Sequence, residues 1–417
     1  MTPDDPRSRR EFLGSLAALS AAGLAPQALW SERRTAGGRR SNAAMGLAAS
    51  GDFAFAPGLV YLQTGSLGPT PRPVMQRAID AWQELELNPA AYAYGEQEHA
   101  MEGVRAKAAA FIGCAMEELV LTRSTTEAMN WVAQGLTFSP GDRVLTTDQE
   151  HPGGRVGWDH VARRQGVVLD IVVIPPGEND PQAIVDRFAK QITPRTRVLS
   201  FSHLLSSTGF RMPVAELSAL SRRRGCIAVV DGAQAVGGID VNVKALGCHA
   251  YATSGHKWLM APEGTGLLYL GAELGRKIDP IALESGRAVY SDSSGVVSIP
   301  SVLGLGAAVD YITAAGIARV ESHNLALRNR LFAALADVPK LRVLSAAPGP
   351  LASPLLSFSL PADIKSEALH QRLRQKHNIE VKLVPGNWFN GNRISTHLFN
   401  SEQDVDALLV ALKKELA

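Results

Sequence analysis

Val229-Val230-Asp231-Gly232-Ala233-Gln234, with Ser254-Gly255-His256-Lys257 beginning 23 residues after Asp231, is the stretch from which the fold and chemistry of this chain can be worked out. An aspartate at the end of an apolar strand can keep a pyridine ring nitrogen protonated. A lysine in a turn of small residues can form a Schiff base with an aldehyde. Each motif alone has a plainer explanation, because Asp-Gly after a strand is usually a turn and most lysines are solvated. Together they favour a site for pyridoxal 5'-phosphate (PLP).

Apolar runs and helical patterns alternate on both sides of these motifs. The expected strands are 118–122, 143–146, 167–174, 197–202 and 226–231. The expected helices between most of them are 125–137, 153–165, 181–191 and 213–224. Near-continuous apolar strands separated by helices predict an α/β fold, with a mostly parallel central sheet covered by helices on both faces. Ligands of such sheets collect beyond the carboxyl ends of the strands.

From about residue 315 onward the pattern changes. The expected elements are a long helix (316–337), strands near 341–346 and 354–360, a helix at 364–375, a strand at 378–384 and a terminal helix from 401. These predict a smaller α+β domain over 316–417. The larger, cofactor-binding domain is expected over 51–315, with its first segment, 51–75, packing on the small domain.

Composition excludes several classes of function. The 417 residues are 46% hydrophobic and 20% charged, which suits a large soluble enzyme. A net charge of +2 leaves no basic excess for binding nucleic acid. The three cysteines (Cys114, Cys226 and Cys248) have neither metal-ligand spacing nor the pattern of a disulfide framework. No metal site is expected.

The N-terminus predicts export. Ser8-Arg9-Arg10-Glu11-Phe12-Leu13-Gly14 precedes a mildly apolar run, 15–25, which is too short to span a bilayer, so no stable membrane insertion is expected. Paired arginines before Phe-Leu resemble a twin-arginine signal, which carries folded proteins into the periplasm through the twin-arginine export machinery. We expect a signal region at 1–30 and a disordered linker at 31–50. A basic amphipathic helix or a disordered tail is the alternative.

Polar side chains follow several of the expected strands. Ser124-Thr125-Thr126-Glu127 opens a helix and suits a phosphate, although it is equally a plain N-cap with a capping glutamate. His151 could stack on a cofactor ring or be an ordinary structural histidine. Gln234 could reach the phenolic oxygen of the ring, and Ser254 and His256 could hold phosphate oxygens.

Taken in order, these motifs resemble the class V aminotransferase family of fold-type I PLP enzymes. The family includes cysteine desulfurases, isopenicillin N epimerase-like proteins and related lyases. The resemblance runs from about Val60 to the C-terminus. Its landmarks are Tyr61-Leu-Gln-Thr-Gly-Ser-Leu-Gly-Pro69, Ser124-Thr-Thr-Glu127, Glu150-His151, Ser202-His203, Asp231-Gly-Ala-Gln234, Ser254-Gly-His-Lys257, and Asn392-Arg393-Ile-Ser-Thr-His397 with Phe399-Asn400.

The resemblance implies roles at the ring of the cofactor. Lys257 would be the Schiff-base lysine and, once released, the general base for the substrate's α-proton. Asp231 would pair with the pyridinium nitrogen, and His151 would stack on the ring face. Gln234 would bond the phenolate oxygen.

It also implies roles at the phosphate and at the substrate. Thr126, Ser254, His256 and the backbone around Thr125 would hold the phosphate. Arg393 would clamp the substrate carboxylate, a planar bidentate task that suits Arg better than Lys.

Three departures from the family pattern modify these expectations. Desulfurases of the family carry a nucleophilic cysteine shortly before the carboxylate-binding arginine, whereas 384–391 here has none, which predicts that the chain is not a cysteine-nucleophile desulfurase. Leu205-Ser206-Ser207-Thr208-Gly209 replaces a Ser-Asn ring contact, and Ser206 is expected to bond the phenolate side. Gly295-Val296 stands where relatives supply a Gly-Thr from the partner subunit of a homodimer, so that contact is expected to be lost or passed to Ser298.

The expected function is that of a homodimeric PLP enzyme, acting on the amino group of an amino acid or an amino-acid-containing metabolite. An aminotransferase-like reaction is preferred. Epimerisation and C–S or β-elimination share its first step, so they remain alternatives. A PLP-fold binding protein without catalysis is the non-enzyme alternative. The residue types do not identify the substrate or cosubstrate.

Overall fold

A computed structural model describes residue 47 and residues 51–417 of the chain. The predicted signal region (1–30) lies outside the described residues, as does the predicted linker (31–50) apart from residue 47. The described residues all belong to one unit of packing, Ala44–Ala417.

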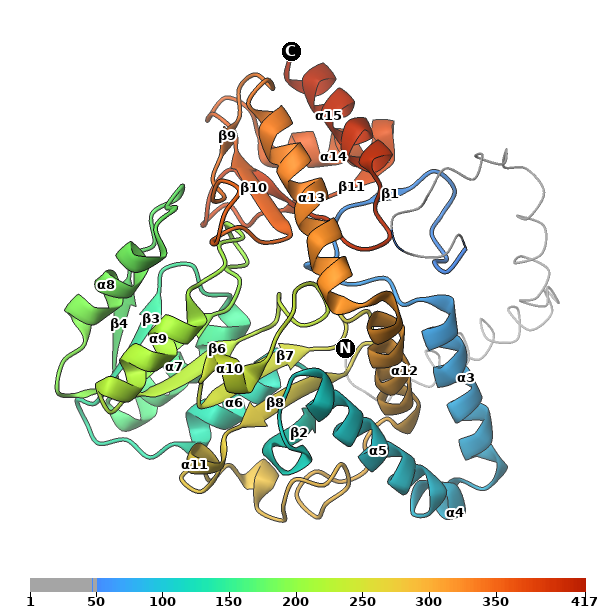
Figure 1. The fold of residues 1–417 in the computed structure, drawn as a ribbon, viewed down its shortest axis with the longest axis vertical. Helices are drawn as coiled ribbons and strands as arrows, with labels where there is room; N and C mark the ends of the chain where they lie inside the picture. Colours follow the sequence, from blue (N-terminus) through green and yellow to red (C-terminus); the bar gives the residue numbers. More distant parts are fainter. Residues whose placement is uncertain (1–46, 48–50) are drawn as a thin grey trace, which may run out of the picture. The chain divides into compact units, whose positions relative to one another are not determined.

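A seven-stranded sheet forms the centre of the larger part of the chain (Figure 1). Its strands are β2 (Leu119–Thr122), β3 (Arg143–Thr147), β4 (Val168–Val172), β5 (Thr196–Ser202), β6 (Ile227–Asp231), β7 (Ala250–Ser254) and β8 (Gly266–Leu270). They lie in the order β2-β8-β7-β6-β5-β3-β4. The strands from β7 to β4 are parallel, and β8 runs antiparallel to both β2 and β7. The predicted α/β class with a mostly parallel sheet is confirmed.

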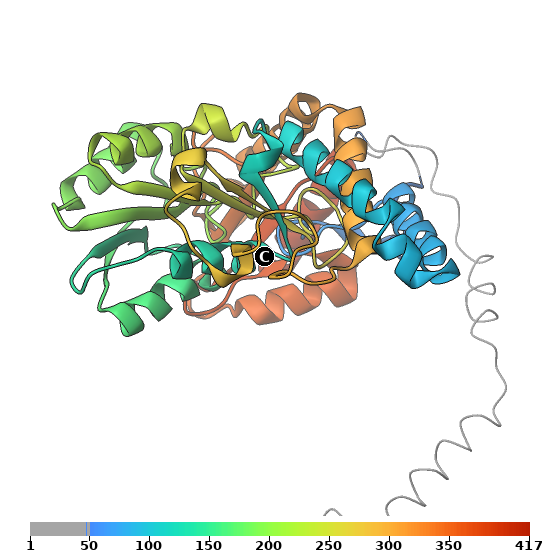
Figure 2. The ribbon, with the colours of Figure 1, turned by 90° about the horizontal axis from the view of Figure 1, so that it is seen from below.

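Helices cover both faces of this sheet (Figure 2). They are α6 (Thr125–Gly135) and α7 (Pro152–Gln165) on one face, and α8 (Pro181–Gln191), α9 (Val214–Arg223) and α10 (Val243–Leu246) on the other. Successive residues of a strand point to opposite faces, so neighbouring strand residues belong to different cores. Val229 packs in the same core as Trp158 of α7. Val230 packs with Leu217 of α9.

A group of long helices lies beyond β2. It consists of α3 (Arg72–Leu87), α5 (Glu96–Phe111) and α12 (Ile299–Ala315), with the short α4 (Pro89–Ala93) between α3 and α5. A separate short helix, α11 (Ala272–Gly275), follows β8. α12 is buried along most of its length against α3 and α5, so its sequence lacks the periodic polar face of a surface helix. No single described helix is long and apolar enough to cross a membrane. α12 and the following helix, Ile317–Leu335, meet that test only as a pair bent by 74°.

The C-terminal part has its own sheet and its own apolar core. Its elements are α13 (Ile317–Leu335), β9 (Arg342–Val343), β10 (Leu355–Ser359), α14 (Ser366–His377), β11 (Ile379–Glu380), β12 (Lys382–Leu383), β13 (Gly391–Ser395) and α15 (Glu402–Leu416). Four of its strands form an antiparallel sheet in the order β12-β13-β10-β9. Its core contains Leu331, Leu356, Leu373 and Leu412. α12 and α13 are separated by a break at Gly316, which has a φ of 82°. The domain boundary expected at 315/316 stays a prediction.

The single strand predicted over 378–384 is divided in two. β11 pairs in parallel with β1 (Val60–Tyr61), whereas β12 pairs antiparallel with β13. The two halves therefore belong to different sheets, with Val381 between them. Through β1, the N-terminal segment that follows residue 51 lies against the C-terminal part of the chain.

Candidate active site

A cavity of about 440 Å³ lies at the carboxyl ends of the parallel strands. Its walls come from the segments after β2, β3, β5, β6 and β7, from the segment after β1, and from β12, β13 and the loop between them. All ten side chains predicted as site residues line it. They are Thr125, Thr126, His151, Ser206, Asp231, Gln234, Ser254, His256, Lys257 and Arg393. Their individual roles remain predictions.

Lys257 and Asp231 carry opposite charges in this cavity. Asp231 ends β6, and its Oδ1 accepts a hydrogen bond from the N–H of Ala233 at 2.9 Å. Burial raises the pKa of the Asp231 carboxyl. Burial, together with the positive charges of Arg393 and Lys382 and against the opposing pull of Asp231, lowers the pKa of Lys257 to about 8. A fraction of Lys257 is therefore neutral at pH 7, as a nucleophile toward an aldehyde must be.

This pKa predicts how the apo-protein takes up an aldehyde. The neutral fraction of an amine with a pKa of about 8 rises about tenfold from pH 7 to pH 9 and then levels off. We expect the rate of PLP attachment to follow that curve in stopped-flow absorbance measurements. An ordinary lysine would show a rise of about 100-fold over the same interval without levelling. A rate still climbing steeply above pH 9 would contradict the lowered pKa of Lys257.

The N-terminus of α6 faces the cavity at one end. Ser124 caps the helix by accepting the N–H of Glu127 at 3.2 Å, so the N-cap interpretation holds alongside any role toward an anion. The N–H of Thr125 donates to Ser254 Oγ at 2.9 Å, and the two hydroxyls lie 2.8 Å apart. The Thr125 N–H, which was expected to bind phosphate, therefore already donates a hydrogen bond to Ser254. Thr126 also lines the cavity. A Cβ on Gly153 would come within 2.3 Å of the Thr126 hydroxyl.

Two glycines leave room around the predicted ring contacts. A Cβ on Gly154 would lie 2.4 Å from Asp231 Oδ2, and one on Gly65 would lie 2.9 Å from Gln234 Oε1. Trp258 donates its indole N–H to Gln234 Oε1 at 2.8 Å, and Gln234 Nε2 donates to the carbonyl of Gly65 at 2.7 Å. These bonds fix the orientation of the amide and leave one Nε2 hydrogen for a ligand. The sequence motifs did not reveal this function of Trp258.

His151 is the N-cap residue of α7 and lines the cavity. Its Nδ1 accepts the N–H of Gly153 at 3.1 Å. Its ring is edge-on to that of Trp388, with 6.4 Å between the centroids. Burial lowers the pKa of His151 to about 4, with Lys257 and Arg393 adding repulsion. The imidazole is therefore neutral at pH 7, which suits stacking better than proton donation.

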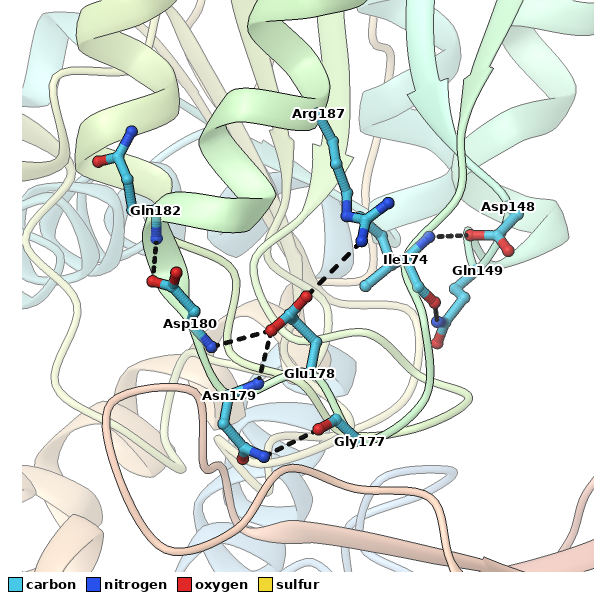
Figure 3. A network of polar contacts seen from close by, with 9 residues as sticks. All are labelled: Asp148, Gln149, Ile174, Gly177, Glu178, Asn179, Asp180, Gln182 and Arg187. Carbon is cyan, nitrogen blue, oxygen red and sulfur yellow. Dashed lines mark hydrogen bonds and ion pairs between the residues drawn. The ribbon is translucent and has the colours of Figure 1, made fainter.

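The segment before His151 is held by polar contacts that the sequence did not predict (Figure 3). Asp148 Oδ1 accepts the N–H of Ile174 at 3.0 Å, and Gln149 Nε2 donates to the carbonyl of Ile174 at 2.7 Å. Gln149 Oε1 also accepts the hydroxyls of Ser207 and Thr208 at 2.7 and 2.6 Å. Gln149 thus connects the His151 segment to the loop that carries Ser206.

Glu150 is a second buried carboxyl that sequence reasoning left without a role. It accepts hydrogen bonds from the hydroxyls of Ser202 and Thr147, both at 2.6 Å. Burial raises its pKa to about 7, and the charge of Asp231 contributes. Because Ser202 lies opposite Asp231 in the β5–β6 pairing, these bonds tie Glu150 to the strand ends that carry the site.

Arg393 enters the cavity from β13. Its Nη1 donates to the carbonyl of Ser206 at 2.7 Å and its Nη2 to Ser66 Oγ at 3.3 Å. Its Nε has no partner among the described residues. Burial lowers its pKa to about 10, so it stays charged at pH 7. Lys382, which the sequence did not single out, lines the same cavity from β12.

The residues present fit PLP. The cavity offers a lysine of lowered pKa, a buried carboxylate and a helix N-terminus. Three buried polar atoms in its lining, Ser206 Oγ, His256 Nδ1 and Arg393 Nε, have no protein partner within residues 51–417. Such atoms need a partner from a ligand or solvent. Cys114, Cys226 and Cys248 are free thiols outside the cavity lining.

Comparisons with known proteins identify the family of this chain. A sequence model of the family described as Aminotransferase class-V matches residues 60–408. Isopenicillin N epimerase from Amycolatopsis lactamdurans is 30% identical over 380 residues, which cover 86% of this chain and 95% of that protein. A probable cysteine desulfurase from Methanothermobacter thermautotrophicus is 30% identical, over 67% of this chain and 73% of that protein. The apo structure of a cysteine desulfurase from Thermococcus onnurineus has a TM-score of 0.75 at 25% identity, over 86% and 94% of the two chains.

These relatives correct one expectation. The missing cysteine in 384–391 was used to exclude the cysteine desulfurases, and that exclusion was wrong, because cysteine desulfurases are among the relatives in both sequence and structure. The physical reason is that reactions at sulfur and at nitrogen share the same lysine, aspartate and arginine. One loop residue therefore does not separate the classes.

The matched region contains every predicted site residue, and the site geometry fits the cofactor expected from the sequence. PLP is therefore the cofactor of this protein. The chain belongs to the class V aminotransferase family.

Proposed function

We propose that this protein removes the α-proton of an amino acid, or of an amino-acid-containing metabolite, in an aminotransferase-like reaction. The observation that carries the proposal is the placing of Lys257, with a pKa of about 8, and Arg393 in one cavity of about 440 Å³. When bound, PLP supplies the electron sink that acidifies the α-C–H bond. Arg393 holds the substrate carboxylate through its planar guanidinium. Lys257 takes the proton at its Nζ.

The pKa values of Lys257 and His151 favour proton transfer by a single group, Lys257. A pKa of about 8 lets Lys257 both accept and return a proton near neutral pH. His151, with a pKa of about 4, stays neutral and does not serve as a second acid. Transamination needs one carrier that moves a proton between two carbons, whereas epimerisation needs the proton to return from the opposite side. The neutral His151 therefore favours the aminotransferase-like reaction.

Epimerisation is the second candidate. Its support is the similarity to isopenicillin N epimerase, which extends over 95% of that protein. C–S bond cleavage is the third, because the similar structures include a cystine C–S lyase, at 24% identity. All three begin with removal of the α-proton, so the products distinguish them.

Product analysis in deuterated water tests the proposal. The PLP-loaded protein is incubated with single amino acids and with periplasmic extract, and products are separated by mass spectrometry and chiral chromatography. An oxo acid formed as the amino group is lost supports the aminotransferase-like reaction. Deuterium at an inverted α-carbon indicates an epimerase, and release of sulfide or persulfide from cystine indicates a lyase. Failure to exchange any α-proton would argue against every enzymatic version.

We also propose that the protein works as a homodimer. Trp82, Tyr94 and Val296 are 62%, 56% and 63% exposed and line a shared cavity of about 420 Å³. Exposed apolar patches of this kind are typical of interfaces, and Val296 belongs to the segment expected to reach a partner's phosphate site. Analytical ultracentrifugation is expected to give a dimer for the wild type and a monomer for Trp82→Glu. A monomeric wild type at micromolar concentration would contradict this proposal.

Export through the twin-arginine pathway is the third part of the proposed function. It is supported by Arg9-Arg10 and the apolar run that follows. A reporter fused to residues 1–50 is expected to reach the periplasm, and to stay in the cytoplasm when both arginines are replaced by lysine. Equal export of both fusions would exclude a twin-arginine signal.

A further inference from the structure

Two cations lie directly opposite each other at the substrate side of the cavity. Lys382 of β12 is the register partner of Arg393 of β13, and both side chains line the cavity. Residues directly opposite in an antiparallel pair project from the same face, with their Cβ atoms about 4.5–5.5 Å apart. Like charges in that arrangement are destabilising. The fold therefore keeps a pair of like charges in the lining of the cavity.

Neither cation is neutralised by the protein. Arg393 donates to a carbonyl and a hydroxyl, and no ion pair of Lys382 occurs in the part of the chain that the structure describes. Asp231 is the one acidic side chain in the cavity lining as described, and it would pair with the pyridinium nitrogen of bound PLP. Partial burial lowers the pKa of Lys382, and repulsion by Arg393 lowers it in the same direction. Anions from outside the protein would relieve this repulsion.

A single substrate carboxylate does not explain why both Arg393 and Lys382 line the cavity. The planar fork of Arg393 matches a carboxylate bidentately, whereas a lysine is a compact point charge with three rotatable donors. Trp388 and Pro385, from the loop between β12 and β13, line the cavity beside them. They offer an apolar surface for the carbons that separate two acidic groups.

We propose that Lys382 binds a second carboxylate of the substrate, so that the protein acts on amino acids with an acidic side chain or acidic substituent. This inference rests on the proposed function, in which Arg393 holds the α-carboxylate. Lys382 is then the residue that distinguishes acidic substrates from neutral ones of the same length.

Calorimetric titration of the PLP-loaded protein with two five-carbon acids tests this directly, without turnover. Glutarate carries two carboxylates and pentanoate carries one. We expect the wild type to bind glutarate more tightly than pentanoate. A hydrogen bond to a charged group contributes enough to make the loss on Lys382→Met about tenfold to a hundredfold for glutarate. The same substitution should change pentanoate binding by less than about threefold.

Two further variants control the result. Lys382→Arg keeps the charge and should retain the preference for glutarate. Lys413→Met removes a lysine from the exposed face of α15 and should leave both affinities unchanged. Equal weakening of both acids by Lys382→Met would overturn the inference, because Lys382 would then share the α-carboxylate with Arg393. No preference for glutarate in the wild type would overturn it as well.

The proposed function is tested separately on the same preparation. Borohydride reduction and peptide mass spectrometry show whether PLP is attached to Lys257. A protein that carries PLP on Lys257 yet does not prefer glutarate refutes the second-carboxylate inference alone. A protein that prefers glutarate but does not attach PLP refutes the proposed function instead.

Discussion

Lys257→Ala is expected to abolish covalent attachment of PLP and to lower α-proton exchange by at least about 10³-fold. The substitution removes the nucleophile that forms the Schiff base and the base that takes the proton. General acid–base catalysis alone contributes about 10²–10⁴-fold. Borohydride trapping with mass spectrometry measures the first effect, and deuterium exchange at the α-carbon measures the second.

The fold of this variant should survive. Lys257 is a desolvated cation whose pKa burial lowers to about 8, so removing it also removes a cost of burying charge. We expect the thermal midpoint of the apo-protein to stay level or rise. Lys244→Ala is the control for PLP attachment and α-proton exchange. Lys244 lies outside the cavity lining and forms an ion pair with Glu118. Full biological activity of Lys257→Ala would instead support a PLP-fold binding protein without catalysis.

Arg393→Met is expected to give the second large effect. Truncating one member of a buried, hydrogen-bonded charge pair costs about 2–5 kcal/mol, which corresponds to a loss in kcat/KM of about 30-fold to several thousand-fold. The variant also frees the carbonyl of Ser206, which accepts from Arg393 Nη1. Calorimetry with pentanoate gives the same comparison without turnover, and binding should fall below detection.

Arg393→Lys separates charge from geometry. It keeps a positive charge but not the bidentate fork, so we expect partial recovery of pentanoate binding relative to Arg393→Met. PLP attachment to Lys257 should persist in both variants, because Arg393 acts on the substrate. Undiminished pentanoate binding by Arg393→Met would show that another group holds the carboxylate.

The sequence predicted those site residues whose position follows from a nearby strand in the chain. Asp231 ends β6, and Thr126 and His151 lie four residues after the ends of β2 and β3. The carboxyl ends of parallel strands meet at one edge of the sheet, so the strand pattern alone brings these residues together. The landmark motifs then supplied Lys257 and Arg393. Five strands of the central sheet, β2 to β6, were predicted for the same reason, whereas β7 and β8 were not. The antiparallel direction of β8 depends on pairing rather than on composition.

What the sequence did not predict depends on partners far along the chain. The division of 378–384 into β11 and β12 arises because β1, more than 300 residues earlier, pairs with one half only. The sequence did not single out Lys382, because its position in the cavity depends on its pairing with Arg393. α12 has few polar positions because α3 and α5 cover it, so periodicity did not mark it. The exclusion of the cysteine desulfurases was wrong because it relied on the residues of one loop, 384–391.

Because the first and last parts of the chain pair with each other, the cavity is completed late in biosynthesis. Gly65 donates its N–H to Ser395 Oγ across 330 residues of sequence, and the Gly65 carbonyl orients Gln234. Contacts of such long range form late, because the entropy of closing a long loop must be overcome first. The cavity can therefore be completed only after the ribosome has released nearly the whole chain. A nascent or truncated chain that stops before residue 395 would expose the lysine without the wall that retains the cofactor.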